Sequence, residues 1–286
     1  MVLEILKSLL FGIVEGITEW LPISSTGHLI LVEQFVKFNE VSPKFWEMFE
    51  VVIQLGAILA VVVLYFKKIW PFTKDKSKAI KSNGVLSIFN KEIINLWGKI
   101  LVACVPAAII GLLFDEVFEK LFYNPTCIAI ALITFGVAFI LIENWNKNKK
   151  GKRSKSEDIT YRSAIIIGFF QVLAAVFPGT SRSGATIIGA LILGISRPEA
   201  AEFTFYLAIP TMFGASLLKL LKFGLEFTST EFVILIVGMI AAFLISVIVI
   251  RFFMNYIKKH NFKIFGYYRI VLGIIVLLCG MLGIIK

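Results

Sequence analysis

Two short polar blocks in this sequence carry side chains suited to catalysis or ligand binding. In the first block, the carboxylates Glu15 and Glu19 are followed closely by Ser24, Ser25 and His28. Carboxylates hold divalent cations or position a base, and a serine near a histidine is a typical nucleophile with its general base. The first block therefore combines the parts expected of a hydrolytic site.

The second block centres on Arg182, which lies among hydroxyl side chains and glycines. Arginine presents five N–H donors in a rigid fork that matches phosphate oxygens. Glycines let backbone N–H groups approach an anion, and the helix that begins here adds its positive dipole end. The block predicts an anion site built from Thr180, Ser181, Arg182 and Ser183, between Gly179 and Gly184.

The elements that must position these blocks are apolar helices. Of the 286 residues, 58% are hydrophobic and only 17% charged, against about a quarter charged in soluble domains. Several stretches approach the roughly 20 apolar residues that cross a bilayer. We predict complete spans at 48–66, 100–114, 124–142, 203–221, 232–250 and 266–285.

Two further apolar stretches, 3–36 and 161–195, are broken by the polar blocks themselves. Each flank of a break is too short to span a membrane. Non-helical backbone at membrane depth is tolerated only where protein or water satisfies it. We therefore predict two re-entrant helix–loop–helix segments.

The two broken stretches repeat one another at an offset of 156 residues. This offset places residues 12–15 over residues 168–171 and Ser25 over Ser181. A helix start with proline in its first turn follows each break, at residues 42–43 and 196–199, and the second start also has the pattern of a capping box. Each repeat then holds one hairpin and three spans, and an odd number of spans inverts the second repeat.

The predicted fold is an all-α integral membrane protein of two inverted repeats, each a re-entrant helix hairpin plus three transmembrane helices. It forms a single membrane domain, 1–286, with repeat one at 1–143, repeat two at 160–286 and a basic cytoplasmic linker at 144–159. The connections at 67–99, 144–162 and 251–263 are basic, whereas 115–123 and 222–231 are mildly acidic. The positive-inside rule places the basic connections in the cytoplasm, and both termini and the first hairpin's opening outside.

Composition also excludes some classes of protein. The net charge of +10 resides mainly in connections between spans, where it sets orientation, so we expect no nucleic-acid partner. Cys104, Cys127 and Cys279 lie inside apolar spans and form neither a disulfide framework nor a CxxC metal motif. The partner expected from composition is the membrane bilayer.

Residues 15–28 and 178–184 together resemble the two signature blocks of the undecaprenyl-diphosphatase family of bacteria, the bacitracin-resistance type. Block order, block separation and the number of spans fit this family over the whole chain. The resemblance implies hydrolysis of undecaprenyl diphosphate, a polyprenyl diphosphate lipid, to the monophosphate and inorganic phosphate. It also implies a divalent cation (Mg²⁺ or Ca²⁺), a multi-pass protein of the bacterial plasma membrane, and an active site facing the outer side.

Within this interpretation, Arg182 holds the transferred phosphate together with Thr180, Ser181 and Ser183. Glu15 and Glu19 hold the cation, or one of them positions the base. Ser25 is the preferred nucleophile, activated by His28, with Ser24 or a directly attacking water as alternatives. The remaining members of the first loop, Thr26 and Gly27, are assigned to substrate binding.

A membrane transporter or lipid flippase for a phosphorylated substrate is the competing function. Inverted repeats whose broken helices meet at mid-membrane are common in secondary transporters. A carrier, however, needs no nucleophile beside a base, and the first block offers both. The sequence leaves the oligomeric state open, with a homodimer among the candidates.

Overall fold

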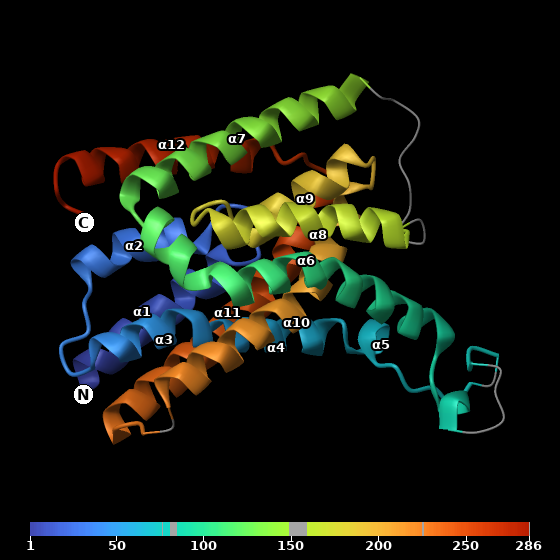
Figure 1. Ribbon diagram of the computed structural model, residues 1–286, viewed down its shortest axis with the longest axis horizontal. Coiled ribbons are helices and arrows are strands. Elements are labelled where there is room, and N and C mark those ends of the chain that lie inside the picture. The colour runs from blue at the N-terminus through green and yellow to red at the C-terminus, as the bar shows by residue number, and fades with distance from the viewer. Residues whose placement is uncertain (76, 81–84, 149–158, 225, 286) are drawn as a thin grey trace.

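A computed structural model describes residues 1–75, 77–80, 85–148, 159–224 and 226–285 (Figure 1). Within these ranges the regular elements are helices joined by loops, and the strand pairing is limited to two isolated β-bridges, Phe72–Phe89 and Ala79–Asn90. The helices are α1 Val2–Thr18, α2 Ser25–Phe35, α3 Pro43–Val52, α4 Gln54–Leu64, α5 Phe66–Ile69, η1 Val85–Ile88, α6 Lys91–Phe122, α7 Pro125–Asn148, α8 Tyr161–Val176, α9 Arg182–Ile192, α10 Arg197–Phe223, α11 Ser229–Ile257 and α12 Lys263–Met281.

The described residues contain six helical segments long and apolar enough to cross a membrane, and each overlaps one predicted span. The all-α, multi-pass membrane class is therefore confirmed. Two details differ from the prediction. The first span is interrupted at Ile53, between α3 and α4, and the predicted connection at 115–123 is mostly helix, because α6 runs on to Phe122.

Both broken stretches are pairs of short helices, as predicted. Ser24 caps α2 and Ser181 caps α9, and each hydroxyl accepts a hydrogen bond from the backbone N–H three residues on, in Gly27 and Gly184. Both serines have positive φ, 73° and 68°, a region that non-glycine residues rarely occupy. The equivalence of Ser25 with Ser181 is therefore wrong: at the caps, Ser24 corresponds to Ser181, an offset of 157.

The helix starts that follow the breaks are also where the sequence indicates. Ser42 caps α3 and accepts a hydrogen bond from the Phe45 N–H. The capping box expected at α10 does not form, because the Ser196 hydroxyl bonds the Glu199 carboxylate instead of a backbone N–H. The Pro198 ring still lies in the first turn, where its missing N–H costs nothing.

The first helix of each hairpin packs on a long helix from the other half of the chain. α1 lies along α11 and α8 lies along α6, while α7 packs along α12. Gly12 and Gly168 permit this approach: a Cβ at these positions would lie 2.4 Å from the Gly238 carbonyl oxygen and 2.3 Å from the Ala103 carbonyl oxygen, respectively.

Figure 1 shows both termini at one end of the molecule, with the start of α6 toward the opposite end. α1 enters from the end that holds the termini, and α8 enters from the other end, so the two breaks lie near the middle of the view. Of the predicted linker 144–159, residues 149–158 are outside the described part of the chain, and the repeat boundaries stay predictions.

We expect Gly168→Ala to destabilise the protein, because the added methyl group would push α8 away from the α6 backbone. Overpacking of this kind costs about 1–3 kcal/mol. Gly111→Ala is the matched control, since its Cβ would meet no atom within 4 Å and alanine favours a helix. Thermal unfolding in detergent measures both variants, and an unchanged Tm for Gly168→Ala would contradict the close packing of α8 on α6.

Candidate active site

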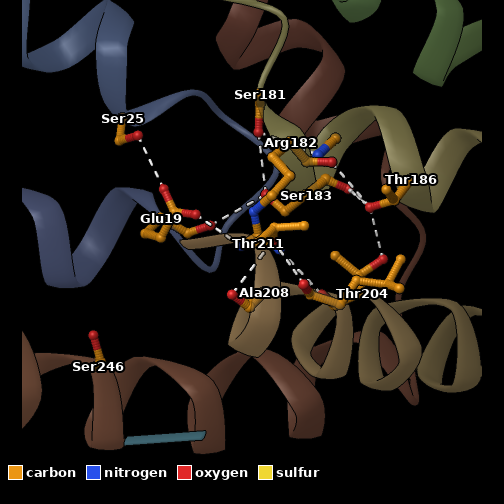
Figure 2. Close-up of polar contacts among 12 residues, drawn as sticks. Glu19, Ser25, Ser181, Arg182, Ser183, Thr186, Thr204, Ala208, Thr211 and Ser246 are labelled. Atoms are coloured by element: carbon orange, nitrogen blue, oxygen red, sulfur yellow. Dashed lines mark hydrogen bonds and ion pairs between the residues drawn. The ribbon is translucent and has the colours of Figure 1, made fainter. Parts of the chain in front are cut away.

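Glu19 joins the two polar blocks. It follows the last residue of α1, and its side chain is only 9% exposed. Oε1 accepts a 2.8 Å hydrogen bond from Arg182 Nη2, and Oε2 accepts a 3.0 Å hydrogen bond from Ser25 Oγ (Figure 2). One carboxylate therefore contacts both the predicted nucleophile and the predicted phosphate ligand.

Arg182 is the first residue of α9, and the neighbouring helix α10 holds it in place. Its Nη1 donates to the Thr204 carbonyl oxygen at 3.2 Å, and the hydroxyls of Thr186 and Thr204 meet at 2.9 Å to brace α9 against α10. Its Nε is buried and has no hydrogen-bond partner. This donor is available to an oxygen of a bound anion.

Hydroxyls of the second block also face the first block. Ser183 Oγ donates to the Glu19 carbonyl oxygen at 3.2 Å, and Ser181 Oγ lies 3.1 Å from Ser183 Oγ. The Thr180 hydroxyl is fully buried without a partner. Buried polar atoms are nearly always satisfied, so an unpartnered hydroxyl beside the loop indicates a position for a ligand or water.

Two helix N-termini converge on this point. α2 begins at Ser25 and α9 begins at Arg182, and the Ser25–Glu19–Arg182 chain of hydrogen bonds connects the two first residues. The N-terminal end of a helix carries a partial positive charge and unpaired N–H groups. The two polar loops thus meet, and the partial positive charges of the two helix ends suit an anion.

Three other predicted residues of the first loop are placed at the start of α2. Ser24 and Gly27 form the cap, so the Ser24 hydroxyl is engaged with the Gly27 N–H at 3.3 Å. Ser24 is 1% exposed, whereas Ser25 is half-buried and hydrogen-bonded to a carboxylate. Thr26, in the first turn of α2, is also half-buried. This arrangement favours Ser25 over Ser24 as the nucleophile.

The predicted pairing of Ser25 with His28 is wrong. His28 Nδ1 lies 2.7 Å from the Ser24 carbonyl oxygen, and Nε2 lies 2.7 Å from the Tyr268 hydroxyl. Nδ1 is bonded within the first turn of α2 and Nε2 is bonded to α12, so both nitrogens are occupied. Glu19 takes the place next to Ser25 that was predicted for the histidine.

Arg269 is a site-forming residue that the sequence analysis missed. It is fully buried in α12 and donates to backbone carbonyl oxygens of both loops. The distances are 3.3 Å from Nη1 to the Pro22 oxygen, 2.9 Å from Nη2 to Gly179 and 2.8 Å from Nη2 to Thr180. An arginine inside an apolar span was the available signal, since such residues seldom lack a functional or structural partner.

Glu15 fits the predicted role of a cation ligand. Its carboxylate is 0% exposed, and neither oxygen has a hydrogen-bond donor. Glu19, Glu50 and Arg182 lie close enough to interact electrostatically with this carboxylate. Within the described ranges no group of three or more His, Cys, Asp or Glu residues has metal-site geometry. Glu15 and Glu19 could thus hold a hard divalent cation only together with phosphate or water oxygens.

Comparisons with known proteins identify the family of the chain. The family model of the bacitracin resistance protein BacA matches residues 8–275. The chain is 61% identical to an undecaprenyl-diphosphatase of Desulfitobacterium hafniense, over 96% of this chain and 95% of that one. It is 61% identical to one of Lachnoclostridium phytofermentans, over 96% of each chain, and 59% identical to one of Enterococcus faecalis, over 96% and 97%. The chain belongs to the bacitracin resistance protein BacA family.

Proposed function

We propose that this protein hydrolyses undecaprenyl diphosphate to undecaprenyl phosphate and inorganic phosphate, and so recycles the lipid carrier of bacterial cell-wall synthesis. Its relatives are named for this substrate, and they match nearly the whole chain. The observation that carries the proposal is the hydrogen-bonded chain from Ser25 through Glu19 to Arg182. An abundant enzyme of this kind would contribute resistance to bacitracin, as the family description implies.

The chain of contacts supports one task for each residue. Ser25 Oγ attacks the terminal phosphorus, and its proton passes to Glu19 Oε2, the acceptor that it already contacts. The bond from that phosphorus to the bridging oxygen breaks, and the polyprenyl phosphate leaves. Arg182 and the N-terminus of α9 stabilise the charge on the equatorial oxygens. Water then releases the phosphate from Ser25, whose oxygen recovers the proton from Glu19.

Glu15 and Glu19 are the residues that would hold a divalent cation, Mg²⁺ or Ca²⁺. The two bare oxygens of Glu15 support this role, because a buried carboxylate in a membrane protein needs a partner. A bound cation would neutralise charge on the phosphate oxygens. Direct attack by water remains the alternative to Ser25, with His28 as the base.

The proposed setting is the bacterial plasma membrane, with two inverted repeats and re-entrant hairpins. The packing of α1 on α11 and of α8 on α6 supports the relation between the two repeats, because each first hairpin helix packs on a long helix of the other repeat. The matching caps at Ser24 and Ser181 support it as well. Loop charge favours an active site that opens to the outer side. The lipid chain would lie among the apolar helices, and a homodimer remains a prediction.

A carrier for a phosphorylated lipid is the second candidate, because broken helices that meet at a central site are typical of secondary transporters. The two functions are separable by experiment. Purified protein in detergent should release phosphate from undecaprenyl diphosphate, a reaction that needs no membrane. Movement of the lipid across liposomes without phosphate release would favour the carrier.

Ser25→Ala should lower the rate of phosphate release by about 10² or more, because the nucleophile is lost. Ser229→Ala, an exposed serine in the first turn of α11, is the control and should retain normal turnover. Initial rates of phosphate release by the two purified variants make the comparison. A Ser25→Ala enzyme with most of its activity would rule out covalent catalysis through Ser25.

Glu15→Gln should raise the cation concentration needed for half-maximal activity by about tenfold or more, since the amide is a weaker ligand for a hard cation. Titration of chelator-treated enzyme with Mg²⁺ or Ca²⁺ measures this shift. Glu47→Gln, on the exposed side of α3, should titrate like the unaltered protein. If the Glu15→Gln curve overlays that of Glu47→Gln, Glu15 is not a cation ligand.

A further inference from the structure

Four phenylalanines form a continuous line from α6 to the second polar loop. Phe114, Phe118 and Phe122 are four residues apart, so they share one face of the last turns of α6. Their ring centroids lie 5.9 Å and 6.2 Å apart in turn, and the Phe122 ring lies 5.0 Å from the Phe177 ring. These four residues, the phenylalanine line, extend for about 12 Å along α6 at 1.5 Å per residue.

The phenylalanine line ends at the candidate active site. Phe177 directly follows α8, and its carbonyl oxygen accepts a 3.2 Å hydrogen bond from the Thr180 N–H. Thr180 carries the buried hydroxyl that has no partner, and Arg182, whose Nε also lacks one, follows two residues later. The last ring of the line and two donors of the anion site therefore belong to one short segment of chain.

Ion pairs on the other side of α6 set the direction in which the line faces. Glu116 lies 3.1 Å from Lys222, and Glu119 lies 3.5 Å from Lys219, so this part of α6 is tied to α10. At 3.6 residues per turn, the two glutamates are on the side of α6 away from the phenylalanines. The line is therefore turned away from α10 and toward the end of α8.

The rings of the line are ordered by one another but are not covered. Phe114 is 43% exposed and Phe177 is 39% exposed, while Phe118 and Phe122 are half-buried. Exposure alone would not distinguish this surface, because lipid tails are as apolar as leucine and any apolar side chain can face them. The distinguishing feature is that stacked aromatic faces lead without interruption to a loop suited to an anion.

We propose that the phenylalanine line binds the isoprenoid chain of the polyprenyl diphosphate, an assignment that rests on the proposed function. The diphosphate is held between the two loops in that function, and its chain is covalently attached, so the chain must leave along a surface that starts there. The line starts at the second loop and continues to the exposed ring of Phe114. The repeated methyl groups of an isoprenoid chain suit aromatic faces, against which they make dispersion contacts.

Phe114→Ala tests the far end of the line, because it removes the ring most distant from the loop. The variant should raise KM for undecaprenyl diphosphate about threefold or more, with kcat little changed. The effect is modest because the chain arrives from detergent or lipid rather than from water, so only packing contacts are lost. KM for farnesyl diphosphate should stay unchanged, since its short chain ends before this ring.

Phe232→Ala is the matched control. Phe232 lies at the start of α11, is 54% exposed and does not belong to the line. The ratio of KM for undecaprenyl diphosphate to KM for farnesyl diphosphate should rise in Phe114→Ala and not in Phe232→Ala. Equal ratios in the two variants and the unaltered protein, at equal Tm, would overturn the assignment.

Photo-crosslinking locates the chain without an activity assay. A photoreactive benzoylphenylalanine at position 118 should form an adduct with undecaprenyl phosphate, which carries the same chain, when this lipid is added to the purified protein in phospholipid nanodiscs. The same group at position 232 should react with phospholipid alone. Mass spectrometry identifies the adducts. If position 118 also yields only phospholipid adducts, the line faces bulk lipid and the proposal is wrong.

The two experiments separate this proposal from the proposed function. An unaltered protein that releases no phosphate from either diphosphate would contradict the proposed function, whatever the crosslinks show. An active protein with an unchanged KM ratio in Phe114→Ala, or without an undecaprenyl adduct at position 118, would contradict the assignment of the phenylalanine line alone.

Discussion

The buried ion pair between Glu19 and Arg182 is the contact on which the rest of the structure depends. Each charge lies at the break of a different helix hairpin, and each side chain is at most 13% exposed. Taking one partner away from such a pair leaves an uncompensated charge, which costs about 3–5 kcal/mol in protein interiors. The two hairpins must therefore meet, and the remaining features bring them together: close packing of α1 and α8 at glycines, paired serine caps, and Arg269 bonded to both loops.

Most of the fold was predictable, because its signals are local. The lengths of the apolar stretches predicted the six spans. The two polar breaks predicted the hairpins, each with the correct flanking helices. The helix ends were less accurate, since amphipathic extensions such as residues 115–122 of α6 are not apolar enough to be recognised as helix. The one-residue error at the caps arose because the second loop holds one more residue between its proline and Ser181 than the first loop holds before Ser24.

The candidate site was predictable as a set of residues but not as a set of pairs. Glu19, Ser25 and Arg182 are brought together as expected. The partner of Ser25 was not predictable, because residues three apart on a helix need not face one another once a capping carbonyl competes for the histidine. The contributions of α12 were missed because Arg269 and Tyr268 lie far along the chain, and only the tertiary fold shows what they contact.

A double-mutant cycle on Glu19 and Arg182 tests the central claim that the two hairpins form one phosphate-transfer site. Phosphate release is measured for Glu19→Gln, for Arg182→Lys and for the double variant, with Arg162→Lys as an exposed control. Residues that act as a unit are strongly non-additive, so the double variant should lose about as much activity as the more damaged single variant. If the two single losses multiply in the double variant, Glu19 and Arg182 act independently, and the account of a shared site is wrong.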